Sequence, residues 1–167
     1  DLPLSPEILR GIRELKFEEL FPIQAQAITP LLQGKDVIGQ AQTGTGKTAA
    51  FGVPMLERLQ RNDKHVQGLV LVPTRELALQ VADHMNHFSK YTPLRAIAIY
   101  GGESIQKQMF ALRRGVQVVV GTPGRVIDHL KRGTLMLNKV KVVVLDEADR
   151  MLDMGFRDDI DYILGKV

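Results

Sequence analysis

The sequence contains no cysteine and no tryptophan, and only 5% of its 167 residues are aromatic. Without cysteine, the chain can form no disulfide, zinc ribbon or iron–sulfur cluster and has no thiol for catalysis. So few aromatic residues argue against a nucleic-acid surface built mainly from stacking platforms. No apolar run approaches the ~18 residues that a membrane span needs, and the first residues do not resemble a signal peptide. We therefore expect no membrane partner and a cytoplasmic location.

The charge balance is nearly even, with 22 Lys and Arg against 19 Asp and Glu and a net charge of +3. Such a balance permits nucleic-acid binding but does not by itself indicate it. Hydrophobic residues make up 44% of the chain and charged residues 25%, which excludes a disordered chain, a collagen and a coiled coil. The length is typical of roughly one domain.

Short apolar runs rich in β-branched residues alternate with stretches of helical spacing. The apolar runs are Val37-Ile38 and residues 69–72, 96–99, 118–120 and 142–145. The helical stretches are residues 48–61, 75–90, 104–114 and 123–132. Nearly continuous apolar runs are typical of parallel strands buried on both faces. The alternation predicts an α/β fold, a mostly parallel twisted sheet with helices on both faces and right-handed crossovers.

Further helices are predicted near both ends of the chain. Ser5-Pro6 and Pro22 are typical of helix starts, the second helix ending near Gly34, and another helix begins at about Phe156. We expect residues 1–34 to form N-terminal helices and residues 35–167 to form the α/β unit. The first residue is not Met, and a doubly wound sheet usually has more than five strands. We therefore expect a piece of a longer protein, cut short at its C-terminal end.

Residues 41–48 have the pattern of a phosphate-binding loop between a strand and a helix. Glycine lets the backbone approach phosphate oxygens, and the N–H groups at the helix start favour an anion. Lys47 would reach the β- and γ-phosphates, and the Thr48 hydroxyl would hold Mg²⁺. Ala41 stands where the usual pattern begins with Gly, and a chance glycine turn is the alternative. The candidate phosphate-binding residues are Gln42, Thr43, Gly44, Thr45, Gly46, Lys47 and Thr48.

Two acidic residues, Asp146 and Glu147, directly follow the apolar run at 142–145. A buried parallel strand would deliver them to the carboxyl edge of the sheet, where ligands bind in open α/β folds. Asp146 would hold Mg²⁺, and Glu147 could orient or deprotonate an attacking water. An exposed acidic loop is the alternative. Lys47, Asp146 and Glu147 are therefore the candidate catalytic residues.

Residues 146–149 spell D-E-A-D, and this segment together with five others resembles the DEAD-box ATP-dependent RNA helicases. Phe17 with 22–24 resembles the adenine-reading Q motif, and 41–48 resembles motif I. Residues 73–78 resemble motif Ia, 101–102 the glycine doublet and 122–125 motif Ib. The order and spacing match nearly the whole chain, although Lys16 stands where the family usually has Gly.

The resemblance implies the first RecA-like domain of such a helicase, with the Q motif within residues 1–34. It also implies ATP and Mg²⁺ as ligands and single-stranded RNA gripped by its backbone. The family's Ser-Ala-Thr motif and second RecA-like domain, with its arginine fingers, would follow beyond residue 167. Asp149 would couple the ATP site to that second domain. The fragment would be a monomer that is nearly inactive in hydrolysis and unwinding.

The resemblance also selects the adenine-binding residues. The Gln24 amide could read adenine through one donor and one acceptor, as Gln does in nucleic-acid recognition, and Phe17 would stack on the base. From the residues alone, Gln26 and Gln42 are equally suitable. Gln24 could also be a surface glutamine, and Phe17 could pack in the core.

The predicted RNA contacts follow apolar strands and precede helices. They are Pro73, Thr74, Arg75, Gly101, Gly102, Thr122, Pro123, Gly124 and Arg125. Helix starts at one sheet edge could track successive phosphates without reading sequence. Helix capping alone is the alternative for each turn. The preference for RNA over DNA depends on the resemblance.

Two other functions fit the same residues. One is an ATP-gated RNA clamp or scaffold that does not unwind, and the other is a DNA-directed helicase or translocase. The partners in either case would be nucleic acid and proteins that the sequence does not name. His84 and His87 lie three residues apart without an evident third ligand, so we expect a solvent-facing pair rather than a metal site.

Overall fold

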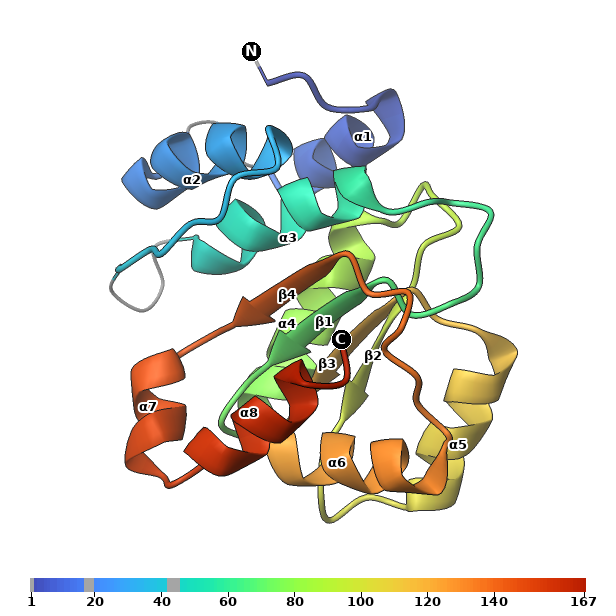
Figure 1. Cartoon of the computed structure of the whole chain (residues 1–167). Coiled ribbons are helices and arrows are strands. Elements are labelled where there is room, and N and C mark those ends of the chain that lie inside the picture. Colours follow the sequence, from blue (N-terminus) through green and yellow to red (C-terminus); the bar gives the residue numbers. More distant parts are fainter. Residues whose placement is uncertain (1, 17–19, 42–45) are drawn as a thin grey trace.

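The structure is a computed structural model that describes residues 2–16, 20–41 and 46–167. Its centre is a sheet of four parallel strands in the order β2-β3-β1-β4 (Figure 1). The strands are β1 (Gly68–Leu71), β2 (Ala96–Ile99), β3 (Val118–Gly121) and β4 (Val142–Leu145). Their last residues are level, because Gly121 pairs with both Leu71 and Ile99, and Leu71 pairs with Leu145. The residues that follow all four strands therefore emerge at one edge.

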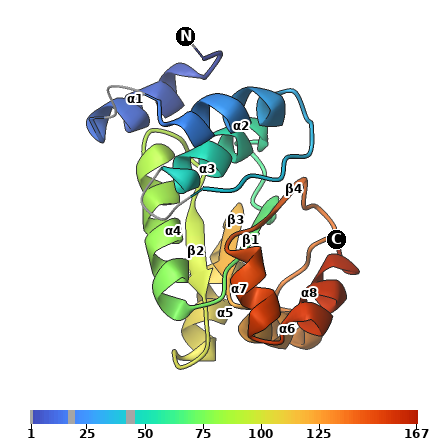
Figure 2. The same ribbon diagram turned by 90° about the vertical axis from the view of Figure 1, so that its left-hand side faces the viewer.

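Helices cover both faces of the sheet, as the sequence predicts (Figure 2). Alternate residues of a strand point to opposite faces. Val70 packs toward one face with α1 (Pro6–Glu14), α3 (Lys47–Arg58) and α4 (Arg75–Phe88). Leu69 and Leu71 pack toward the other face. There they meet α6 (Pro123–Arg132), α7 (Ala148–Asp153) and α8 (Arg157–Leu164), with α5 (Ile105–Arg114) beside them.

The N-terminal helices lie on the α3 side of the molecule (Figure 1). Helix α2 (Pro22–Leu32) packs along α3, and Ile8 of α1 is fully buried in the core that α3 and α4 share. Ser5 occupies the predicted cap position of α1, yet its hydroxyl donates to the Glu57 carboxylate, 2.8 Å away, rather than capping the helix. The hydroxyl also accepts from Arg61 at 2.6 Å. This bonding joins the start of α1 to the end of α3.

The predicted strand at Val37-Ile38 is wrong. Residues 35–41 have no regular structure, and residues 33–40 are all exposed. In the described part of the chain, β4 pairs only with β1, so β4 is an edge strand. A strand forms only where a neighbour supplies hydrogen-bond partners, and two β-branched residues do not specify that neighbour. The helix that follows the loop is nevertheless present as α3.

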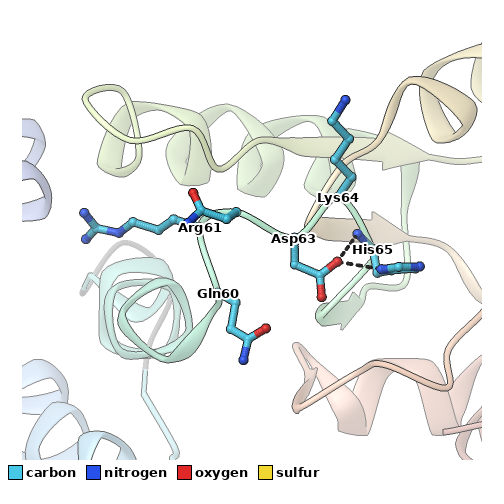
Figure 3. Close-up of a pocket in the computed structure, with 6 residues that line it drawn as sticks. Gln60, Arg61, Asp63, Lys64 and His65 are labelled. Carbon is cyan, nitrogen blue, oxygen red and sulfur yellow. Dashed lines mark hydrogen bonds and ion pairs between the residues drawn. The ribbon is translucent and has the colours of Figure 1, made fainter.

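The segment after α3 forms a shallow hollow lined by residues 60–65 (Figure 3). Asp63 accepts hydrogen bonds from the backbone and the ring of His65. The hollow precedes β1 and therefore lies at the amino end of that strand. The predicted site residues follow the carboxyl ends of the strands, so the hollow is separate from the candidate site.

Candidate active site

The carboxyl ends of the four strands gather most of the predicted site residues. Thr74 follows β1, Gly101 follows β2, Thr122 follows β3 and Asp146 follows β4. Because the strand ends are level, these residues form one row along the sheet edge. Lys47 reaches the same edge from the first turn of α3. The sheet therefore brings together segments that are about 100 residues apart in sequence.

Lys47 and Asp146 face each other across this edge. The Lys47 Nζ lies 4.0 Å from Asp146 Oδ1. The Asp146 side chain is only 9% exposed, whereas that of Lys47 is 30% exposed. This separation is a loose ion pair rather than a tight hydrogen bond. The ammonium group can therefore turn toward another anion without breaking a close contact.

Burial raises the pKa of Asp146 above its ordinary value. The positive charge of Lys47 opposes this rise, and the neighbouring Glu147 adds to it. The carboxylate thus sits where its negative charge is poorly solvated, and a cation nearby would stabilise it. A buried carboxylate at the end of a strand next to a lysine is therefore a candidate functional group.

Glu147 adopts a left-handed backbone conformation, with φ 53° and ψ 48°, at the cap position of α7. A residue with a Cβ pays roughly 1–2 kcal/mol for this conformation. Its carboxylate lies 3.8 Å from Arg150 Nη1 and is 30% exposed. Strained residues of this kind concentrate at functional sites. Asp149 lies two residues further on, in the first turn of α7, and is exposed.

Gln24 is buried against the start of α3. It is 3% exposed, whereas Gln26 is exposed. Its side-chain oxygen accepts from the backbone N–H of Phe21 at 3.0 Å, and its amide nitrogen donates to the Gly46 carbonyl at 3.2 Å. The structure therefore excludes the surface position that the sequence left open for Gln24. Its bond to Gly46, in the predicted phosphate loop, distinguishes it from Gln26.

Gly46 caps α3 with φ 80°, a conformation that favours glycine. A Cβ on Gly46 would collide with the Gln24 amide and with the Phe21 ring. The loop is therefore packed closely against the start of α2 at this point. Thr48 follows in the first turn of α3. The predictions for Phe17, Gln42, Thr43, Gly44 and Thr45 lie outside the described residues.

Thr74 and Arg75 form the next turn along the edge. The Thr74 hydroxyl accepts from the Leu77 N–H at 3.3 Å and thus caps α4, as the alternative to an RNA contact supposes. The Arg75 guanidinium lies over the Tyr100 ring, 5.0 Å from its centroid, and Arg75 is exposed. Pro73, in contrast, is buried. Arg75 is therefore held beside the row by an aromatic ring that the sequence did not single out.

The turn at 122–125 does not show the helix capping that was the alternative to an RNA contact. Within the described structure, the Thr122 hydroxyl makes no capping bond to α6. Pro123 is buried at the first position of the helix, and Gly124 is exposed. Pro has no N–H to leave unpaired at that position. The side chain of Arg125 is 13% exposed and turns inward, toward Gln108 and the Glu103 carbonyl.

Sequence analysis did not single out three residues that lie beside these turns: Tyr100, Gln108 and His129. Gln108 is 5% exposed and His129 is fully buried. Burial and then the charge of Arg125 lower the pKa of His129. The only local signal is a polar residue on the buried side of an amphipathic helix, which is too common to be specific. Of the pair that we expected to face solvent, His87 is exposed and lies 3.6 Å from Asp83, whereas His84 is half-buried beside the Phe88 ring. The described residues contain no cluster of three metal-binding side chains.

A model of the DEAD/DEAH box helicase family matches residues 21–167. The chain belongs to this family. Over its whole length it is 52% identical to the DEAD-box ATP-dependent RNA helicase CshA of Bacillus cereus, of which it covers 32%. Over 99% of its length it is 54% identical to the ATP-dependent RNA helicase DeaD of Mycobacterium tuberculosis, of which it covers 30%. The chain thus spans about a third of the length of these curated relatives.

Solved structures of the family share the fold. A DEAD box protein from Methanococcus jannaschii superposes with a TM-score of 0.94 at 44% identity, over 99% of this chain and 46% of that one. A hypothetical ATP-dependent RNA helicase from Sulfolobus tokodaii gives a TM-score of 0.89 at 38% identity, over 98% of this chain and 47% of that one. The predicted family and the RecA-like α/β fold are therefore confirmed.

Among the described residues, no helix combines the length and apolar character that crossing a bilayer requires.

Proposed function

We propose that this chain is the ATP-binding and hydrolysing first domain of an ATP-dependent RNA helicase. The observation that carries the proposal is the meeting of Lys47 and Asp146, 4.0 Å apart at the carboxyl edge of the sheet. Lys47 belongs to the predicted phosphate loop, and Asp146 is a buried carboxylate directly after β4. In phosphoryl-transfer sites, such a pair serves the phosphates and the metal. The names of the relatives support the same activity.

The donor set at this edge fits Mg²⁺ bound together with ATP. Mg²⁺ usually binds through one or two carboxylates plus substrate phosphates and water, rather than through a cage of protein ligands. Asp146 supplies a buried carboxylate whose charge is only loosely balanced by Lys47. We propose that Asp146, through water, and the Thr48 hydroxyl hold the ion. When bound, Mg²⁺ would neutralise charge that develops on the phosphates.

The residues of the chain then have distinct tasks. Lys47 turns from Asp146 to the β- and γ-phosphates, which carry more negative charge. The Gly46 backbone and the start of α3 point N–H groups at the phosphates. Glu147 orients the attacking water and accepts its proton. Asp149 couples this site to the second domain.

Adenine recognition is assigned to Gln24 and Phe17. An amide side chain has two N–H donors and two oxygen lone pairs. One donor and one acceptor position of Gln24 are used by Gly46 and Phe21. The second N–H and the second lone pair can bind adenine N7 and the exocyclic amino group. Guanine presents an oxygen instead of that amino group, so ATP should bind more tightly than GTP.

Single-stranded RNA is proposed to lie along the row of turns that follows β1, β2 and β3. The turns proposed to contact the strand contain Pro73, Thr74, Arg75, Gly101, Gly102, Thr122, Pro123, Gly124 and Arg125. Arg75 offers an exposed guanidinium, and the start of α6 offers N–H groups that the Thr122 hydroxyl does not cap. Contacts to phosphate and sugar position a strand without reading its sequence. Binding should therefore tolerate any sequence.

In the intact protein, we propose that ATP and RNA close a second RecA-like domain over this edge and locally separate a duplex. Arginine fingers of that domain would supply roughly 10³–10⁵ in rate, as they do in other P-loop enzymes. This chain alone should therefore bind ATP but hydrolyse it very slowly, and it should be monomeric.

Titration of this chain with fluorescent ATP and GTP analogues in the presence of Mg²⁺ tests the nucleotide part of the proposal. We expect ATP to bind at least about 10-fold more tightly than GTP, since leaving one buried hydrogen-bonding group unpaired costs about 1–3 kcal/mol. Lys47→Ala should weaken binding strongly, whereas Lys64→Ala, an exposed lysine at the opposite sheet edge, should not. Equal binding of the two nucleotides would contradict the assignment of Gln24.

A further inference from the structure

The exposed turn Gly101-Gly102 is held by hydrogen bonds on both of its sides. The carbonyl of Tyr100, just before the turn, accepts from Gln108 Nε2 at 3.0 Å. The carbonyl of Glu103, just after it, accepts from Arg125 Nη1 at 3.0 Å. A Cβ added to Gly101 would meet nothing within 4 Å, so the turn itself stands in solvent. Its geometry is therefore set by its two anchored ends.

The two anchoring side chains are also bonded to each other. Arg125 Nη1 donates to Gln108 Oε1 at 3.1 Å, and His129 Nε2 contacts the same oxygen at 3.0 Å. The other ring nitrogen of His129 contacts the Thr134 hydroxyl at 2.8 Å. With Gln108 and His129 buried, this network is shielded from water. Low local dielectric strengthens such a network when its groups are paired and makes breaking it costly.

The network connects two turns that are both proposed to bind RNA. Arg125 belongs to the first turn of α6, and Gln108 lies on α5, directly behind the Gly101-Gly102 turn. The Arg125 guanidinium is directed at protein acceptors and at Asp128, whose carboxylate lies 3.6 Å from its Nε. An arginine bonded inward in this way is poorly placed to act as a free charge for phosphate.

We propose that Gln108 and Arg125 are positioning residues that fix the Gly101-Gly102 turn against the start of α6, so that both turns bind one RNA strand together. This inference rests on the proposed RNA function. Two phosphate-binding turns cooperate only when their spacing is set before the ligand arrives, because ordering them on binding costs affinity. Arg125 thus acts through the Glu103 carbonyl and the Gln108 side chain rather than through a phosphate.

Substitutions in this chain distinguish positioning from direct contact. Gln108→Met keeps the side-chain volume and changes no charge, and Arg125→Met removes the other anchor. Arg125→Lys keeps the charge, but its single nitrogen cannot replace a guanidinium that places Nη1 at Gln108 and the Glu103 carbonyl and Nε beside Asp128. Arg113→Met is the matched control, because Arg113 is exposed near the far end of α5 and its loss removes the same charge. Binding of a fluorescent oligouridine strand is measured by anisotropy, and ATP affinity is measured in the same preparations.

We expect Gln108→Met and Arg125→Met each to weaken RNA binding about 10-fold, as the loss of one or two buried hydrogen bonds implies. The double variant should bind RNA about as tightly as the single variant with the lower affinity, because the two residues act as one unit. Arg125→Lys should recover little, and Arg113→Met should stay within about twofold of the unaltered chain. ATP affinity should not change in any of them, which shows that the fold is intact.

Hydrogen exchange at the amides of residues 101–104 tests the anchoring without RNA. We expect faster exchange in Gln108→Met than in the unaltered chain. Unchanged exchange, or RNA binding by Gln108→Met equal to that of the unaltered chain, overturns the proposal. Full binding by Arg125→Lys beside weak binding by Arg125→Met shows a direct phosphate contact and also overturns it. If the unaltered chain binds no RNA, the proposed RNA interface fails, and the exchange rates still decide whether the turn is anchored.

Discussion

Gln24 donates a hydrogen bond to the carbonyl oxygen of Gly46 at 3.2 Å, and so ties the start of α2 to the phosphate loop. The same amide accepts from the Phe21 N–H. The proposed adenine-reading residue therefore also supports the loop that would hold the phosphates. Loss of its amide should affect nucleotide binding through both contacts.

Gln24→Ala should weaken ATP binding by at least about 10-fold, because it removes a buried amide that bridges two backbone groups. It should also reduce the preference for ATP over GTP. Gln26→Ala, two residues along the same helix, is the control, since Gln26 is exposed. Titration of a fluorescent ATP analogue measures both variants. Equal affinities of the two variants would show that Gln24 has no part in the site.

Gly46→Ala should destabilise the chain by more than the strain of its backbone alone. Gly133 provides the comparison, because it has φ 73° and nothing within 4 Å of an added Cβ. Gly133→Ala should therefore cost only about 1–2 kcal/mol of unfolding free energy. Gly46→Ala adds collisions with Gln24 and Phe21 and should also impair ATP binding. Urea unfolding of both variants gives the difference, and equal losses would contradict the close packing described for Gly46.

Asp146→Asn should stabilise the chain at neutral pH while impairing hydrolysis. Burial raises the pKa of Asp146 in the folded state. Between the ordinary carboxyl pKa and the raised one, the folded state binds more protons than the unfolded state, so stability falls as the pH rises through this window. An asparagine carries no charge and avoids that loss. Thermal unfolding should therefore show a higher Tm for Asp146→Asn at pH 7 and a smaller difference below the ordinary carboxyl pKa.

The control for Asp146 is Asp153→Asn, since Asp153 is exposed at the end of α7. Its Tm should change little at either pH. A Tm for Asp146→Asn that is lower at pH 7 than that of the unaltered chain would show that the ion pair with Lys47 outweighs the cost of burial.

Glu147→Gln should separate binding from hydrolysis. The amide keeps the shape of the side chain but cannot accept a proton from water. General-base catalysis contributes typically about 10²–10⁴ in rate, so kcat for ATP hydrolysis should fall by about that factor in the chain joined to its second domain. ATP affinity should stay within about threefold. A variant with full turnover would require another proton acceptor.

Much of the fold could be predicted because its signals are local. The apolar runs at 69–72, 96–99, 118–120 and 142–145 correspond to the four strands, and Pro123 marks the start of α6 within the chain. The strand predicted at Val37-Ile38 is absent, because the pairing of a strand depends on a neighbour distant in sequence. The short helix α7 was not foreseen, since it follows a strained residue, Glu147, rather than a capping signal.

Site residues could be predicted only where the residue types of a motif themselves imply a chemical role. Lys47 and Asp146 could be paired before their distance was known, because both residue types are needed beside a phosphate. Burial of Gln24 could not be read from α2, where Gln26 is an equivalent residue type. The hydrogen bonds from Arg125 to Gln108 and to the Glu103 carbonyl could not be predicted from the sequence either, because they depend on how α5 and α6 pack.

The rate of ATP hydrolysis by this chain joined to the proposed second RecA-like domain tests the central claim most directly. The rate is measured without nucleic acid, with single-stranded RNA and with DNA of the same sequence, and Lys47→Ala serves as the inactive control. We predict stimulation of at least about 10-fold by RNA and little by DNA, and the 2′-hydroxyl is the group by which a protein can distinguish the two. Equal stimulation by DNA would contradict an RNA-directed enzyme, and no stimulation by either would contradict coupling of the ATP site to the row of turns along the sheet edge.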